Sequence, residues 1–206
     1  MAETGLIRSW KGLLALYTVA GFIETIFWGQ MNAFTPLYLG ELGVPEEEIT
    51  RYVGITAAVV GFAGLPFLPF WGALADRYAR KPVIVRSFVV YLVAGTAAML
   101  AQSVWLFIAG RAVMSLALGN SGLMMTTLAE RTPNRRQALA FSIMNSAGPV
   151  GIFLGPLIGG PVVDRYGFRV LMAINLVLLL VVVLALTFGY HDSYRGKSRE
   201  PVLRMA

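Results

Sequence analysis

The sequence predicts an all-α membrane protein with six transmembrane helices joined by short loops. Of its 206 residues, 57% are hydrophobic and only 14% are charged, whereas a soluble domain carries about 25% charged residues. The apolar residues form six continuous stretches, each long enough for a helix to cross about 30 Å of hydrocarbon. A β-barrel would instead show alternating segments of about ten residues. The six predicted spans, in chain order, are 12–39, 52–75, 83–101, 104–129, 137–163 and 168–190.

Each span has recognisable boundaries. The first is too long for the apolar core of a signal peptide, and no small-residue cleavage site follows it. Pro45 and the acidic residues 46–48 precede the second span within a predicted loop at 40–51, and Pro82 opens the third. Pro133 lies in the turn between the fourth and fifth. We therefore expect an N-terminal segment at 1–11, a six-helix bundle at 12–190 and a basic tail, or the start of a central loop, at 191–206.

Composition excludes several function classes. The chain has no cysteine, which excludes disulfides, thiol catalysis and cysteine-based metal sites. A single histidine, His191, cannot form a zinc site alone. No Ser/His/Asp set or phosphate-binding loop is evident, so we expect neither an enzyme nor a metal or other cofactor. The net charge of +6 does not indicate a nucleic-acid partner, because nucleic-acid-binding domains are not this apolar.

The basic residues predict the orientation of the bundle. If the N-terminus is cytoplasmic, the inner side carries 13 of the 17 Lys and Arg residues and the outer side carries Arg51, Arg165 and Arg169. Short cytoplasmic loops are enriched in Lys and Arg. We therefore expect a multi-pass protein of the cell (inner) membrane, surrounded by membrane lipid, with both termini cytoplasmic.

The loop after the second span carries an ordered motif, Gly72-Ala-Leu-Ala-Asp76-Arg77-Tyr-Ala79-Arg80-Lys81-Pro82. It resembles the loop G-x-L-x-D-R-x-G-R-K between helices 2 and 3 of the major facilitator superfamily, with alanine at position 79 in place of the usual glycine. The resemblance implies that Asp76, Arg77 and the basic residues beside them act in a cytoplasmic gate. An incidental basic loop is the alternative.

The fifth span contains a second motif, Gly151-Ile-Phe-Leu-Gly155-Pro156-Leu-Ile-Gly159-Gly160. It resembles the G-x-x-x-G-P-x-x-G-G motif of the proton-driven drug antiporters in the same superfamily. Glycines four residues apart allow close approach of another helix, and Pro156 bends its own helix. The implied role is conformational. A generic small-residue packing face is the alternative.

Two charged residues lie inside the predicted membrane core. Arg111 resembles the arginine of the superfamily's helix 4 motif, although Met114 and Ser115 depart from that pattern. Counting 1.5 Å per residue from the helix ends places Glu24 and Arg111 at nearly the same depth. We therefore expect them to pair and, by resemblance, to couple transport to a proton. A purely structural ion pair, or extension of the Arg111 side chain to the outer surface, is the alternative.

The outer part of the first span combines aromatic and amide side chains, including Trp28, Gln30 and Asn32. This mixture suits an amphipathic organic substrate, although aromatic residues in a membrane helix often serve only packing. These three residues are candidates for substrate binding.

The resemblance covers all six spans and is most like the N-terminal half of a drug/proton antiporter. It implies secondary active transport of small organic molecules, through proton-coupled efflux by alternating access. The partner would be a second six-helix half, supplied by the missing C-terminal half, a second chain or a homodimer. The alternative function is a non-transporting membrane subunit that scaffolds or assembles a larger membrane complex.

Overall fold

The computed structural model describes residues 7, 9–77, 80–117 and 119–190. The named elements among these residues are all helices, and one isolated β-bridge joins Ile7 to Tyr190. The predicted tail at 191–206 and most of the segment at 1–11 lie outside the described residues. Five of the helices or helix pairs are long and apolar enough to cross a membrane. The multi-pass prediction is therefore confirmed, while the helix count and several boundaries differ from the six predicted spans.

The first three crossings follow the predicted spans closely. Helix α1 covers Trp10–Glu41, and α4 covers Arg80–Met99. Between them, α2 (Glu46–Gly64), the 3-10 turn η1 (Leu65–Phe67) and α3 (Leu68–Arg77) form one bent crossing. Because α2 already begins at Glu46, the predicted outer loop at 40–51 was too long.

The fourth predicted span is broken. It consists of α5 (Val104–Met114), the 3-10 turn η2 (Ser115–Ala117) and α6 (Asn120–Arg131). Gly119 adopts a left-handed backbone conformation with φ of 95°, which a side chain would disfavour. The continuous hydropathy of residues 104–129 predicted one unbroken helix, because hydropathy does not register a local turn such as the one at Gly119.

The fifth and sixth predicted spans form a single element, α7 (Asn134–Gly189), which reverses direction at Gly167. Gly167 has φ of 80° and ψ of 167°, a conformation outside the helical region. We call residues 134–166 the first arm of α7 and residues 168–189 its second arm. These arms coincide with the predicted spans 137–163 and 168–190, so five apolar elements account for all six stretches.

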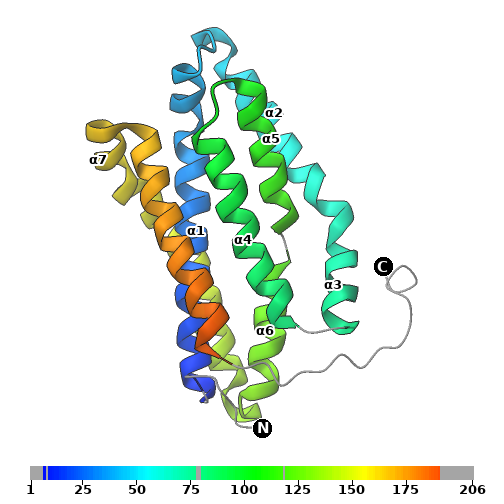
Figure 1. Ribbon diagram of the computed structural model, residues 1–206. Helices are drawn as coiled ribbons and strands as arrows, with labels where there is room; N and C mark the ends of the chain where they lie inside the picture. Colours follow the sequence, from blue (N-terminus) through cyan, green and yellow to red (C-terminus); the bar gives the residue numbers. More distant parts are fainter. Residues whose placement is uncertain (1–6, 8, 78–79, 118, 191–206) are drawn as a thin grey trace.

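Helix α1 lies against both arms of α7 (Figure 1). On the second arm, Phe168 stacks on Tyr38 of α1 with ring centroids 4.4 Å apart. At the opposite end of the bundle, Tyr17 donates a hydrogen bond to the hydroxyl of Tyr190 over 2.8 Å. The beginning of α1 and the end of α7 therefore meet at one end of the bundle.

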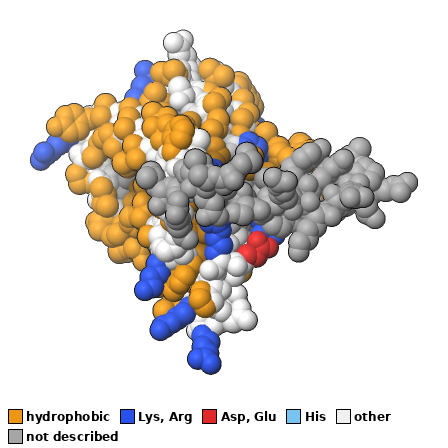
Figure 2. Space-filling view, turned by 60° about the horizontal axis from the view of Figure 1, so that its bottom comes forward, with side chains coloured by type: hydrophobic (Ala, Val, Ile, Leu, Met, Phe, Trp, Pro, Cys, Tyr) orange, Lys and Arg blue, Asp and Glu red, His pale blue; other side chains and the backbone are white. Residues whose placement is uncertain are grey.

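That end is rich in basic side chains. Figure 2, which brings it forward, shows Lys and Arg side chains projecting around a largely hydrophobic surface. The basic residues in the elements that begin or end there are Lys11, Arg80, Lys81, Arg131, Arg135 and Arg136. Elsewhere, large apolar side chains such as Phe62 and Phe153 are more than 70% exposed, as suits contact with lipid or another membrane-embedded surface.

Candidate functional site

Glu24 is a buried carboxylate in the middle of α1. Tyr91 of α4 donates its hydroxyl to Glu24 Oε1 over 2.8 Å, and the Asn120 side-chain amide of α6 donates to Oε2 over 2.9 Å. Both partners are neutral, and both are themselves buried. Glu24 also lines a cavity of about 190 Å³ between α1, α6 and the first arm of α7. The carboxylate is therefore held by two donors and has space beside it.

The break at Gly119 places one of these donors. Because α6 starts at Asn120, the side chain of its first residue is directed at Glu24. The Asn120 side-chain oxygen in turn accepts a hydrogen bond from the Ser121 backbone over 2.8 Å. The amide is thereby oriented with its nitrogen toward the carboxylate.

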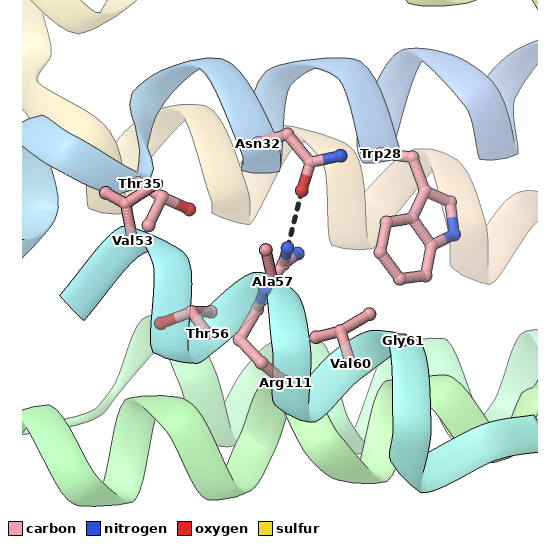
Figure 3. A pocket seen from close by; sticks show the side chains of 9 residues that line it. All are labelled: Trp28, Asn32, Thr35, Val53, Thr56, Ala57, Val60, Gly61 and Arg111. Atoms are coloured by element: carbon pink, nitrogen blue, oxygen red, sulfur yellow. Dashed lines mark hydrogen bonds between the residues drawn. The ribbon is translucent and has the colours of Figure 1, made fainter. Parts of the chain in front are cut away.

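Arg111 of α5 lies in a different place, at a cavity of about 320 Å³ (Figure 3). Its Nη2 donates to Asn32 Oδ1 of α1 over 2.5 Å, and its guanidinium carbon lies 5.2 Å from the Trp28 ring centroid. The side chain is only 3% exposed. The residues lining this cavity are Trp28, Asn32, Thr35, Val53, Thr56, Ala57, Val60, Gly61 and Arg111.

The predicted contact between Glu24 and Arg111 was wrong. Within the described part of the chain, the hydrogen bonds and ion pairs of these two residues do not join them. Arg111 instead contacts Asn32, eight residues and about 12 Å further along α1. The depth estimate failed because α1 is 32 residues long, about 48 Å, and so exceeds the thickness of the hydrocarbon core.

Trp28 connects the two sites. Its ring packs edge-on against Tyr91 with centroids 6.0 Å apart, and the Arg111 guanidinium lies near its ring. Tyr91 in turn donates to Glu24. Two packed aromatic side chains therefore lie between the carboxylate and the guanidinium, which do not contact each other directly.

The three candidates for substrate binding do not lie together in the structure. Trp28 and Asn32 line the Arg111 cavity, whereas Gln30 points toward α7. Gln30 donates to the Gly155 carbonyl over 2.9 Å and accepts from the Asn175 amide over 2.6 Å. It therefore ties α1 to both arms of α7.

The glycine motif of the first arm packs directly against α1. A Cβ atom at Gly155 would lie 2.9 Å from the Ile26 carbonyl oxygen, and one at Gly151 would lie 2.1 Å from Thr25 Oγ1. At Gly159 the nearest atom would be a Phe34 ring carbon at 2.9 Å. A side chain at any of these three positions would therefore crowd its neighbours, and at Gly155 the nearest atom belongs to the α1 backbone.

The other two motif positions have different surroundings. A Cβ at Gly160 would meet nothing within 4 Å among the described atoms. Pro156 lacks an N–H group, so the Ile152 carbonyl loses its helical donor. A Cβ atom at Gly29 of α1 would lie 3.0 Å from the Ile152 carbonyl oxygen. Because Gly29 has no side chain, α1 leaves room for this carbonyl.

The motif at residues 72–82 is partly described. Gly72, Asp76 and Arg77 belong to α3, while the side chains of Asp76 and Arg77 and all of residues 78–79 lie outside the description. Arg80 forms an ion pair with Glu130 of α6 over 2.8 Å. Lys81 donates to the Thr187 carbonyl over 2.7 Å and also to that of Tyr190. These two residues connect the start of α4 to the ends of α6 and α7.

Sequence reasoning missed Tyr91, Asn120 and Asn175. The two asparagines are amides inside long apolar runs, and such residues commonly form hydrogen bonds between membrane helices. That signal was available in the sequence. Tyr91 offered no comparable signal, because tyrosine is ordinary in a membrane helix. Among the described residues, no group of three metal-ligating side chains comes together.

Comparison with known proteins places these features in context. Residues 10–204 match the sequence profile of the Major Facilitator Superfamily. Multidrug resistance protein MdtG of Citrobacter koseri is 28% identical over 206 residues, which cover 100% of this chain and 51% of that protein. MdtG of Serratia proteamaculans is 31% identical over 190 residues, or 91% of this chain and 46% of the relative.

A solved structure shares the fold. The POT family transporter PepTSo superposes with a TM-score of 0.78 at 20% identity, covering 94% of this chain and 41% of that chain. The present chain thus spans about half the length of the curated relatives it matches.

Proposed function

This chain belongs to the Major Facilitator Superfamily, and we propose that it forms one half of a secondary transporter that exports small organic molecules in exchange for protons. The relatives named as multidrug resistance proteins support this proposal, because the chain aligns with about half of each. The large exposed apolar side chains also suit a second membrane-embedded half. That half would come from a continuing chain, a second chain or another copy.

The proposed location is the cell (inner) membrane, with both chain termini cytoplasmic. The support is the gathering of Lys and Arg side chains at the end where α1 begins and α7 ends. Cytoplasmic surfaces of membrane proteins carry this excess of basic residues.

The observation that carries the coupling proposal is the environment of Glu24. An ionised carboxylate accepts hydrogen bonds at both oxygens, as Glu24 does from Tyr91 and Asn120. A protonated carboxyl gains an O–H donor on one oxygen, and that oxygen is a weaker acceptor than it was in the ionised form. Protonation of Glu24 would therefore weaken its hydrogen bond with Tyr91 or with Asn120, and Asn120 begins α6. A change in the protonation of Glu24 would thereby act on the start of α6.

The basic end of the bundle supplies the proposed cytoplasmic gate. Arg80 and Lys81 hold the start of α4 against α6 and α7, and by resemblance Asp76 and Arg77 act beside them. Gly151, Gly155 and Gly159 keep α1 and the first arm of α7 in close contact. Rocking of this half as one body would then open one side of the transporter at a time.

The test uses the chain together with a second six-helix half in proteoliposomes. A panel of fluorescent organic compounds identifies one that the unaltered protein moves under a pH gradient. We expect Glu24→Gln to abolish gradient-driven accumulation but to retain exchange of the compound without a gradient. The control is Glu41→Gln, which neutralises an exposed carboxylate at the end of the same helix. Full gradient-driven accumulation by Glu24→Gln would remove Glu24 from the coupling mechanism.

A further inference from the structure

Arg111 has hydrogen-bonding capacity that the described residues leave unused. Its Nε and Nη1 atoms are buried and have no hydrogen-bond partner there, while Nη2 is bonded to Asn32. The whole side chain is 3% exposed. A guanidinium remains charged under all physiological conditions, so this charge is not removed by loss of a proton.

The surrounding side chains do not neutralise that charge. The residues lining the Arg111 cavity include no carboxylate. Glu24, the acidic side chain expected to pair with Arg111, is bonded to Tyr91 and Asn120. A buried charge is stable when it is both paired and hydrogen-bonded, and the guanidinium of Arg111 has only one neutral acceptor.

The cavity has the size and shape to admit a counter-ion. Its volume of about 320 Å³ lies between α1, α2 and α5, and Arg111 projects between the first two of these helices (Figure 3). Small-molecule sites in proteins begin near 300 Å³. A ligand with one aromatic ring or with two fused rings fits a cavity of this volume.

The walls of the cavity indicate the rest of the ligand. Trp28 presents an aromatic ring beside the guanidinium, and Val53, Ala57 and Val60 of α2 add apolar surface. The hydroxyls of Thr35 and Thr56 already donate to backbone carbonyls of their own helices. Arg111 is therefore the one charged residue among the side chains that line this largely apolar cavity.

We propose that this cavity binds a small aromatic carboxylate, with the oxyanion on Arg111 and the ring against Trp28 and α2. Charge-assisted hydrogen bonds between a guanidinium and a carboxylate are among the strongest in proteins. The proposal rests on the proposed function where it identifies this ligand class as the transported substrate. The binding site itself is independent of transport.

The test measures binding to the purified chain in lipid nanodiscs, without any pH gradient. The probes are 2-naphthoate and its neutral isostere 2-naphthamide, and binding is followed by titration calorimetry. We expect the unaltered chain to bind naphthoate at least about tenfold more tightly than naphthamide. This comparison needs no variant. Equal affinity for the two probes, or binding of neither, would overturn the proposal.

Variants then locate the interaction. Arg111→Gln should lower naphthoate affinity to the level of naphthamide, while Arg111→Lys should retain part of the preference because it keeps the charge. The control, Arg51→Gln, removes an exposed charge from α2 that does not line the cavity, and should leave both affinities unchanged. Undiminished naphthoate preference in a folded Arg111→Gln protein, judged by its melting temperature without probe, would refute the assignment to Arg111.

Competition by chloride distinguishes an aromatic ligand from a simple counter-ion. Naphthoate binding should persist in 150 mM chloride, a concentration at which exposed charges are already well screened. Complete displacement by chloride would reduce the site to an inorganic ion site and overturn the ligand class. If the protein transports organic compounds without preferring anions, this proposal fails and the proposed function stands. If the cavity prefers naphthoate but the protein transports nothing, the proposed function fails and this proposal stands.

Discussion

Asn120 donates a hydrogen bond from its side-chain amide to Glu24 over 2.9 Å, although the two residues are 96 positions apart in the chain. Gly119 makes this contact possible, because its left-handed conformation ends one helical segment and starts α6 at Asn120. Gly119 belongs to none of the motifs recognised in the sequence, yet it positions Asn120 to donate to Glu24, the carboxylate proposed to carry the proton.

The Asn120 contact should be measurable as stability. Asn120→Leu removes a donor to a buried carboxylate, and we expect the free energy of unfolding to fall by about 1–3 kcal/mol. The control is Asn145→Leu, since Asn145 lines the same cavity but is exposed. The measurement is denaturant unfolding in detergent micelles. Equal losses in the two variants would show that the Glu24 contact contributes nothing specific.

A side chain at Gly119 should destabilise the turn that precedes α6. Gly119→Ala forces a left-handed conformation on alanine, which costs about 1–2 kcal/mol, and should lower the melting temperature. Gly122→Ala is the matched control, because Gly122 lies within α6 and has open space around it. We expect this control to be neutral or slightly stabilising. A melting temperature unchanged by Gly119→Ala would contradict the conformation assigned here.

The loss of stability caused by an alanine in the glycine motif should depend on the position of the substitution. At Gly155 an added methyl group would press on the Ile26 carbonyl oxygen, so Gly155→Ala should separate α1 from α7 and cost about 1–3 kcal/mol. Gly160→Ala changes the same residue type five positions later, where no described atom is close. Thermal unfolding of both variants measures the difference, and Gly155→Ala should have the lower melting temperature. Similar melting temperatures would show that the motif does not act through packing on α1.

The orientation should be testable by cysteine labelling, because the chain has no native cysteine. Cysteine introduced at Glu47, exposed at the start of α2, should react with an impermeant maleimide from outside the cell. Cysteine at Arg135, exposed at the start of α7, should react only after the membrane is opened. The reverse pattern would invert the proposed topology.

Much of the fold was predictable because hydropathy and charge are local properties of the sequence. A continuous apolar run must become a helix in a membrane, since its backbone groups have no other partners there. For that reason the predicted spans at 83–101 and 168–190 correspond closely to α4 and the second arm of α7. The glycine motif was equally evident, because its spacing alone aligns three small residues on one helix face.

The partners of the polar side chains were decided only by the tertiary structure. Glu24 and Arg111 were recognised as buried charges, but their separation depends on the length of α1 and on the way that α5 lies against it. Gln30 resembled a substrate ligand in sequence, yet its helix face meets Gly155 and Asn175. A sequence specifies which side chains must leave water, whereas the side chains they meet depend on the rotation and offset of whole helices, which no single helix determines.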